Sequence, residues 1–363
     1  MSVRKLFQGS FGTLSCLQME TSPFTKVVVS AIRKLYPEKL ADASFDNTGC
    51  KDCLLVKLIR SSNKKVLLEA PYRPDHLNNT VLLTIDLTTA VTNEAIARKD
   101  SIIIAYHPII FRPLKSLSLK NTQQTTLLRL AQEGISVYCP HTAVDAVEDG
   151  LNDWLADIIT GRETDRCMNQ KKRGLTHISS SITASTRSVI IPVRNTPVGF
   201  ENAGYGRIVR FQNPISLKTL LERITRGLDS KNGLNIAIPQ NISGTSKQRI
   251  SISSVGICAG SGGSMLGGLD VDVLFTGELS HHEALAAIEE GKVVITAGHS
   301  NTERNFLKRK LRHRLQEQIN QEISKYSSPD SSDLSKLVNF SIDVSEVDRD
   351  PYEIVRLHDE DWK

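Results

Sequence analysis

Cysteine, aromatic residues and long apolar runs are scarce in this chain, and two of these scarcities exclude a class of protein. Six cysteines in 363 residues are too few for a disulfide scaffold and indicate a reducing compartment. Cys50 and Cys53 have the spacing of a zinc or redox pair, but no second pair follows at zinc-finger spacing, which disfavours such a site. The longest apolar runs, such as 102–106, have the length of a strand, whereas a membrane span needs roughly 20 residues. A membrane-spanning protein is therefore excluded.

An excess of charge of one sign is also missing. The chain carries 45 Lys and Arg against 40 Asp and Glu, and the net charge of +5 is spread thinly. The densest basic stretch, 304–314, has leucines at helical spacing, which is typical of an amphipathic helix with a solvated basic face. We therefore expect no direct binding of nucleic acid.

The residues that are present predict a globular α/β protein of about two domains. Hydrophobic residues make up 39% and charged residues 23%, which excludes a disordered chain. Strand-like and helix-like runs alternate, which favours mostly parallel, helix-covered sheets. We divide the chain into a flexible N-terminal segment at 1–22, a first α/β domain at 23–160, a linker at 161–187, a second α/β domain at 188–352, whose last helix can pack on the first, and a tail at 353–363.

Hydrophobic periodicity predicts the individual elements of each half. In the first half we expect helices at about 26–36, 88–96, 125–132 and 151–159, and strands at 54–59, 81–87, 102–106 and 135–139. In the second half we expect strands at 189–193, 207–211, 234–238, 250–258, 271–276, 293–297 and 338–344, and helices at 217–228, 280–290 and 302–323.

The first 18 residues raise the only question of targeting. They contain Arg4 and Lys5, several hydroxyl residues and no acid, and Met19 could itself begin a protein. This pattern resembles a short mitochondrial presequence, although an ordinary flexible tail remains an alternative. We expect a cytoplasmic protein, with the mitochondrion as a second location.

Three of the predicted strands run directly into histidines. One strand ends at His107, and a second leads to His141, followed four residues later by Asp145. A third leads to His299, followed four residues later by Glu303. A single histidine at a strand end is usually structural, but functional groups of α/β sheets collect at strand ends, so three together favour a metal centre. Imidazole and carboxylate ligands suit zinc, iron, manganese or nickel, and two carboxylates can bridge two ions.

A fourth strand end carries Glu278 and His282 in or near the first turn of a predicted helix. Acidic groups there can simply complement the helix dipole, or Glu278 and His282 can act on substrate or orient metal ligands. Both interpretations stand. The glycine-rich stretch 258–264 can cradle a phosphate, but it lacks the Lys-Ser/Thr of a P-loop, which favours a tight turn.

Several short motifs, taken in order, resemble one known family. The motifs are Ser-Phe-Asp-Asn-Thr-Gly at 44–49, Asp-Leu-Thr at 86–88, Tyr-His-Pro at 106–108, His-Thr-Ala-Val-Asp-Ala at 141–146, Gly-Leu-Asn at 150–152, Gly-Glu-Leu-Ser-His-His at 277–282, Gly-His-Ser-Asn-Thr-Glu-Arg at 298–304 and Asp-Arg-Asp-Pro at 348–351. With these motifs in this order, the chain is similar to the eukaryotic NIF-three-like proteins (Ngg-one-interacting factor three) over about residues 23–352.

The resemblance implies two intertwined α/β domains with mixed, mostly parallel sheets, assembled as a toroidal homohexamer around a dinuclear metal centre. Carried over by position, the resemblance implies two divalent ions per chain. Their ligands would be His107, Asp145, His299 and Glu303, with His141 as a further ligand. Many bacterial members have two adjacent histidines where this chain has Tyr106 and His107. The second ion therefore loses a nitrogen ligand here, and it binds weakly or takes a phenol, a water or His141 instead.

Two functions follow from the resemblance. The first is metal-dependent hydrolysis of a nucleotide or other small molecule, as in type-two homologues of GTP cyclohydrolase, with Glu278 or His282 moving protons. The alternative is a metal-binding interaction protein without turnover, which partners a transcriptional regulator and so also enters the nucleus. The sequence names neither the substrate nor the metal.

Overall fold

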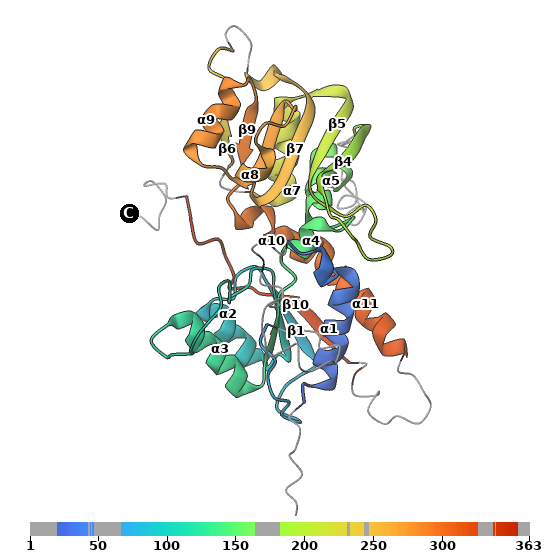
Figure 1. The fold of residues 1–363 in the computed structure, drawn as a ribbon, viewed down its shortest axis with the longest axis vertical. Coiled ribbons are helices and arrows are strands. Elements are labelled where there is room, and N and C mark those ends of the chain that lie inside the picture. Colours follow the sequence, from blue (N-terminus) through green and yellow to red (C-terminus); the bar gives the residue numbers. More distant parts are fainter. Residues whose placement is uncertain are drawn as a thin grey trace, which may run out of the picture.

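Two β-sheets, one above the other in Figure 1, form the framework of the chain. The computed structural model describes residues 20–42, 44, 46, 67–163, 182–230, 233–242, 247–325, 337 and 339–354. The two sheets and their helices confirm the expected α/β fold class. The expected strand at 54–59, the Cys50 and Cys53 pair, and most of the segments 1–22, 161–187 and 353–363 lie outside the described residues.

The first sheet has four parallel strands in the order β10-β1-β2-β3. These are β1 (Thr80–Thr84), β2 (Ile102–Ala105), β3 (Ser136–Tyr138) and β10 (Ser341–Val344). Alternate residues face opposite sides: Leu83 and Ile104 pack in one cluster with α1 (Pro23–Leu35), while Leu82 and Ile103 pack in another with α2 (Thr89–Arg98) and α3 (Thr122–Glu133). Both faces are thus covered, which explains the uninterrupted apolar runs of these strands.

The second sheet has six strands in the order β4-β5-β7-β8-β9-β6 and is mixed. Strands β7, β8 and β9 run parallel, whereas β4 with β5, β5 with β7 and β6 with β9 are antiparallel. The bounds are β4 (Ser185–Pro192), β5 (Gly204–Ser216), β6 (Asn235–Ala237), β7 (Ser251–Ser261), β8 (Val273–Glu278) and β9 (Val293–Thr296). One face packs on α5 (Leu151–Thr160) and α7 (Leu217–Leu228), the other on α8 (Gly263–Leu266) and α9 (His281–Glu289).

The C-terminal part of the chain returns to the first sheet. Strand β10 pairs with β1, and α11 (Arg312–Lys325) packs on α1. The long helix expected at 302–323 is confirmed over most of its length, since α10 (Arg304–Phe306), the π segment η5 (Leu307–Leu311) and α11 follow one another without a break. Only its start differs, because Ser300–Thr302 forms the separate short turn η4. A π segment within an α-helix is often found at functional sites.

Short elements connect the two halves, and side-chain caps set the limits of the longer helices. The remaining described helices are η1 (Glu38–Leu40), α4 (Thr142–Ala146) and η3 (Lys247–Arg249). Helix α7 begins where the Ser216 hydroxyl accepts from the Thr219 N–H and is closed by Asp229, whose backbone is left-handed.

Within the described residues, every helix falls short of the length and apolar character needed to cross a membrane. The domain limits given above stay a prediction.

Candidate metal centre

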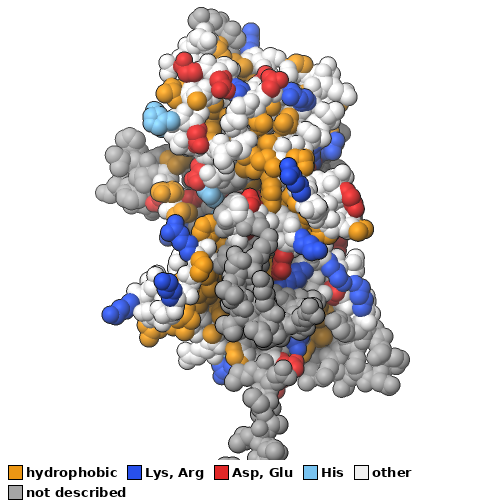
Figure 2. Space-filling view, viewed as in Figure 1, with side chains coloured by type: hydrophobic (Ala, Val, Ile, Leu, Met, Phe, Trp, Pro, Cys, Tyr) orange, Lys and Arg blue, Asp and Glu red, His pale blue; other side chains and the backbone are white. Residues whose placement is uncertain are grey.

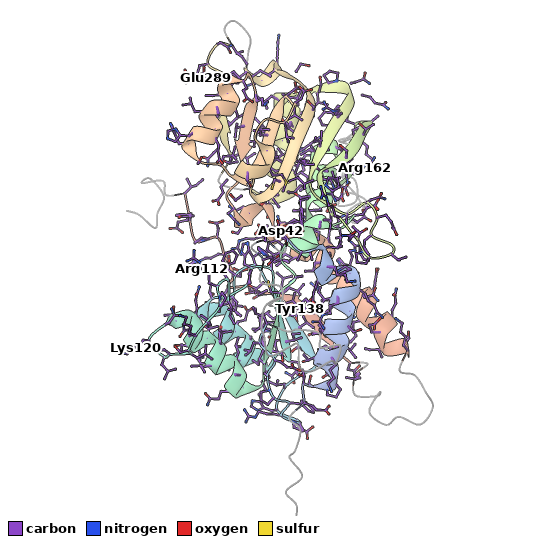
Figure 3. The ribbon with its side chains drawn as sticks, viewed as in Figure 1. Asp42, Arg112, Lys120, Tyr138, Arg162 and Glu289 are labelled. Carbon is purple, nitrogen blue, oxygen red and sulfur yellow. The ribbon has the colours of Figure 1, made fainter. Side chains whose placement is uncertain are left out.

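The centre lies between the two sheets, where strand ends from both meet. Strands β1 and β2 of the first sheet and β8 and β9 of the second bring their C-terminal ends to this junction, near Asp42 in Figure 3. At this level the space-filling view shows histidine and acidic side chains close together (Figure 2). Parallel strands deliver functional groups at their carboxyl ends, so this placement is the one that the strand-end argument predicts.

Three of the expected residues form a compact group. His107, His299 and Glu303 each offer a ligand atom, and these atoms lie within 4.8 Å of one another. His107 Nε2 is 3.4 Å from Glu303 Oε2, and His299 Nε2 is 3.8 Å from Glu303 Oε1. The two rings have centroids 5.3 Å apart. Such a group could bind a divalent cation.

A carboxylate holds each histidine ring by its Nδ1 atom. His107 Nδ1 lies 2.9 Å from Asp86 Oδ1, and His299 Nδ1 lies 2.9 Å from Glu278 Oε1. Both Nε2 atoms are thereby directed toward Glu303. A carboxylate on the far nitrogen is the usual companion of a metal-ligating histidine, because it fixes the tautomer and the ring orientation.

Sequence reasoning assigned no role to Asp86 or Asp46. Asp86 follows β1 and holds His107, whereas Asp46 Oδ1 lies 2.8 Å from His141 Nδ1. Both aspartates belong to motifs that carry the family resemblance, which was the available signal. Their partners could not be known, because each contact joins segments far apart in the sequence.

Glu303 is buried in a way that suits a cation. Its residue is 2% exposed, and within the described residues its Oε2 atom forms no hydrogen bond, with His107 Nε2 3.4 Å away. Burial by itself would lower the pKa of His107, but hydrogen bonding and the charges of Asp86 and Glu303 raise this pKa to about 10. A protonated His107 thus supplies positive charge between two carboxylates, and a metal ion that replaced this proton would supply the same.

Gly260 packs directly behind the group. It is the second-last residue of β7 and has φ +63°, and a Cβ atom there would lie 3.0 Å from both Glu303 Oε1 and His299 Nε2. Its N–H donates to Thr302 Oγ1 at 2.9 Å. The glycine-rich stretch therefore allows a strand to approach the metal group closely.

Asp145 and His141 lie beside this group, with the His141 ring 5.7 Å from the His107 ring between centroids and Asp145 in contact with Tyr106. The Tyr106 hydroxyl donates to Asp145 Oδ1 at 2.7 Å, and burial raises the pKa of Asp145 to about 7. The Tyr106 ring lies 5.1 Å from the His107 ring and 5.7 Å from the His141 ring, between centroids. His141 has φ 37°, a strained value for a residue with a side chain, of the kind that clusters at functional sites.

Glu278 and His282 have different surroundings. Glu278 contacts His299, as described, whereas the His282 ring packs edge-on against His281, with centroids 5.3 Å apart. Helix α9 begins with a full capping box, in which the Glu283 side chain accepts from the Ser280 N–H. No contact within the described residues joins His282 to the metal group, so its catalytic role stays a prediction.

A cavity of about 670 Å³ opens beside His107. Asp86 and His107 line it on the side of the metal group, and the starts of α2 and α3 line it opposite. Arg349 and Pro351, from the C-terminal part of the chain, complete the wall. The volume lies in the range of small-molecule sites.

The same residues fall within a region shared with known proteins. Residues 25–331 match the family model described as Duf34/NIF3 (NGG1p interacting factor 3). The "Protein NIF3 homolog" of Schizosaccharomyces pombe is 42% identical over 291 residues, which cover 80% of this chain and 88% of that protein. The "NGG1-interacting factor 3" of Saccharomyces cerevisiae is 37% identical over 296 residues, which cover 80% and 90%. A Bacillus cereus protein related to NIF3 shares the fold, with a TM-score of 0.60 at 19% identity and coverage of 90% of this chain and 98% of that one.

Proposed function

Since the chain belongs to the Duf34/NIF3 family, we propose that it is a metal-dependent hydrolase whose centre is the group of His107, His299 and Glu303. The observation that carries this proposal is the fit of that group to a cation. Two histidine rings, each held by a carboxylate, turn their Nε2 atoms toward the buried carboxylate of Glu303, whose Oε2 lies 3.4 Å from His107 Nε2 and forms no hydrogen bond within the described part of the chain. A buried carboxylate oxygen without a hydrogen bond is costly, and a bound cation would offset that cost.

The residues around the centre bind, orient and move protons. When bound, a divalent ion such as zinc, iron, manganese or nickel would polarise a substrate oxygen and lower the pKa of a coordinated water. Asp86 and Glu278 keep the His107 and His299 rings in place. We retain Glu278 and His282 as the groups that move protons, and the exposure of the Glu278 side chain supports its access to substrate.

A second ion per chain would use Asp145 and His141. The positions of both residues support this proposal. The centroid of the His141 ring lies 5.7 Å from that of the His107 ring, and the Asp145 carboxylate accepts a hydrogen bond from Tyr106. The hydrogen bond from Tyr106 competes for that carboxylate, so we propose that the second ion binds more weakly than the first.

The substrate would occupy the cavity beside His107. Its volume of about 670 Å³ accommodates a nucleotide or a molecule of similar size. We further propose a homohexamer in the cytoplasm, with the mitochondrion and the nucleus as further locations, on the basis of the family resemblance and of residues 1–18.

A second candidate function is protein interaction without turnover. The relative from Saccharomyces cerevisiae is named as an interacting factor, and a transcriptional regulator is the partner we propose on that basis. The described surface offers a groove of about 720 Å³ between α7 and β6, lined by Leu221, Ile236 and Ile238, away from the histidines.

Metal titration of the purified full chain tests the first proposal. We expect calorimetry with Zn²⁺ or Mn²⁺ to show tight binding that Glu303→Gln weakens at least about 10-fold, because the negative charge of the carboxylate is lost. His313→Ala, a change at an exposed histidine of α11, is the control and should bind as the original chain does. Equal binding by Glu303→Gln would contradict the assigned centre. A metabolite turnover screen with and without chelator then separates a hydrolase from an interaction protein.

A further inference from the structure

We propose that Arg304 and Asp348 are positioning residues of the metal centre, which lock the C-terminal segment (residues 345–352) onto the ligand-bearing loops of both sheets. This inference rests on the proposed metal site. In Figure 1 the segment leaves β10 and runs past the junction toward the second sheet.

The centre has a geometric requirement that the sheets alone do not meet. His107 follows β2 of the first sheet, whereas His299 and Glu303 follow β9 of the second. Backbone hydrogen bonds fix strands within a sheet, but none of the described strand pairs joins one sheet to the other. Side chains must therefore hold the loops at the separation that a shared ion requires, and a ligand displaced by about 1 Å is poorly placed.

Arg304 joins the two loops directly. It follows Glu303 in the chain, and one guanidinium nitrogen lies 3.1 Å from Asp86 Oδ2 of the first-sheet loop. The other oxygen of Asp86 holds His107, so one carboxylate connects Arg304 with a metal-binding ring. A second guanidinium nitrogen lies 2.8 Å from Asp348 Oδ1. The planar guanidinium suits such a double contact, which a lysine cannot reproduce.

Asp348 fixes the same loop through its backbone. Its Oδ2 accepts from the Ile85 N–H at 2.7 Å and from the Asp86 N–H at 3.4 Å, and its side chain is only 4% exposed. Asp348 thus contacts both the backbone of Asp86 and the arginine that grips the Asp86 side chain.

The C-terminal segment also contacts the second-sheet loop. Asp350 Oδ2 accepts from the Ser300 hydroxyl at 2.7 Å, and Ser300 Oγ in turn accepts from Arg304 Nε at 3.1 Å. At its other end, the Asp348 N–H donates to Ser345 Oγ at 3.1 Å. Residues 345–350 therefore reach the loops of both sheets with buried or half-buried polar contacts.

The test is metal binding by full-length variants, with Co²⁺ as the probe. We expect Asp348→Asn and Arg304→Lys to weaken Co²⁺ binding about 10- to 100-fold, the usual effect of losing a group that orients metal ligands. We also expect both to change the visible absorption band of bound Co²⁺, because His107 shifts. Glu346→Gln, a change at an exposed residue of the same segment, is the matched control and should leave affinity and spectrum unchanged.

The outcomes separate this inference from the proposed function. If the original chain and His107→Ala bind Co²⁺ equally, the metal site itself is wrong. If His107→Ala loses binding while Asp348→Asn and Arg304→Lys both match Glu346→Gln, only the positioning role is wrong. Thermal unfolding identifies a variant that fails to fold, in which case the other variant decides. The double variant should bind no more weakly than the weaker single one, because both residues act through the same contact.

Discussion

Gly260 leaves no room for a side chain beside the metal group. We predict that Gly260→Ala lowers the free energy of unfolding by about 1–2 kcal/mol, since its φ of +63° is unfavourable for alanine, and that it also weakens metal binding. The new Cβ atom would press on Glu303 Oε1 and His299 Nε2, both 3.0 Å away. Thermal unfolding and calorimetry measure the two effects.

Gly268 supplies the matched control for this prediction. Its φ is +74°, but a Cβ atom there would meet nothing within 4 Å. Gly268→Ala should therefore lose similar stability and keep full metal affinity. Equal metal affinity in the two variants would show that Gly260 is needed only for its backbone conformation.

At the level of single residues, the sequence predicted which of the proposed ligands lie together better than it predicted their surroundings. His107, His299 and Glu303 were predicted from strand ends, and they lie within 4.8 Å of one another. The roles of Asp86 and Asp46, which hold the His107 and His141 rings, were not predicted, because these roles depend on contacts between distant segments. Tyr106 was named as a departure, but its hydrogen bond to Asp145 required coordinates.

At the level of elements, one buried acid fastens α11 to α1. Glu322 accepts from the Ser30 hydroxyl at 3.0 Å and pairs with Lys34 and Lys325. Burial would raise the pKa of Glu322, but hydrogen bonds from Lys325, Lys34 and Ser30 lower it to about 2. A depressed carboxyl pKa stabilises the fold above the unfolded value of about 4.5, and this stability disappears as the pH falls toward 2.

We therefore predict that Glu322→Gln lowers the melting temperature at pH 7 and that the difference from the original chain shrinks steadily below about pH 4.5. The exposed Glu317 of the same helix is the control, and Glu317→Gln should have little effect at any pH. Melting curves from pH 7 to pH 3 provide the measurement. A difference that did not change with pH would mean that packing, rather than charge, explains the loss.

Most elements were predictable, because they depend on local signals. The expected helix at 217–228 is α7 to the residue, since Ser216 caps its start. The π turn at Leu307–Leu311 was not predictable, because leucines four residues apart suit an α-helix and a π turn alike. Nor could the sequence show that β10 joins the first sheet, since four residues of strand pattern do not specify a partner.

At the level of the whole molecule, we predict a closed hexamer. The expectation comes from the family resemblance, and a ring whose internal cavity faces the metal centres would restrict access to them. Light scattering of the full chain at micromolar concentration, with metal present, should give a mass of about six chains. A monomeric mass would reject the prediction, and the same measurement after chelation shows whether assembly depends on the metal.

The N-terminal residues give a further prediction at this scale. A protein that begins at Met19 should unfold at an unchanged temperature, because α1, the first described helix, begins at Pro23. Fluorescent fusions of the two forms should differ in location, with mitochondrial signal only from the longer one. Identical distributions would leave residues 1–18 without a role in targeting.

The position of β10 has a consequence for the timing of synthesis. Strands β1, β2 and β3 have all been synthesised once the chain reaches Tyr138, but the edge strand β10 of the same sheet begins only at Ser341. Roughly 200 residues separate these events, which at about 5–20 residues per second corresponds to tens of seconds. Asp348 and Asp350 are synthesised later still, so their contacts with the loops of both sheets can form only after that point. The proposed metal site also needs His299 and Glu303, so an ion that the chain meets after Tyr138 but before these residues would find His107 alone.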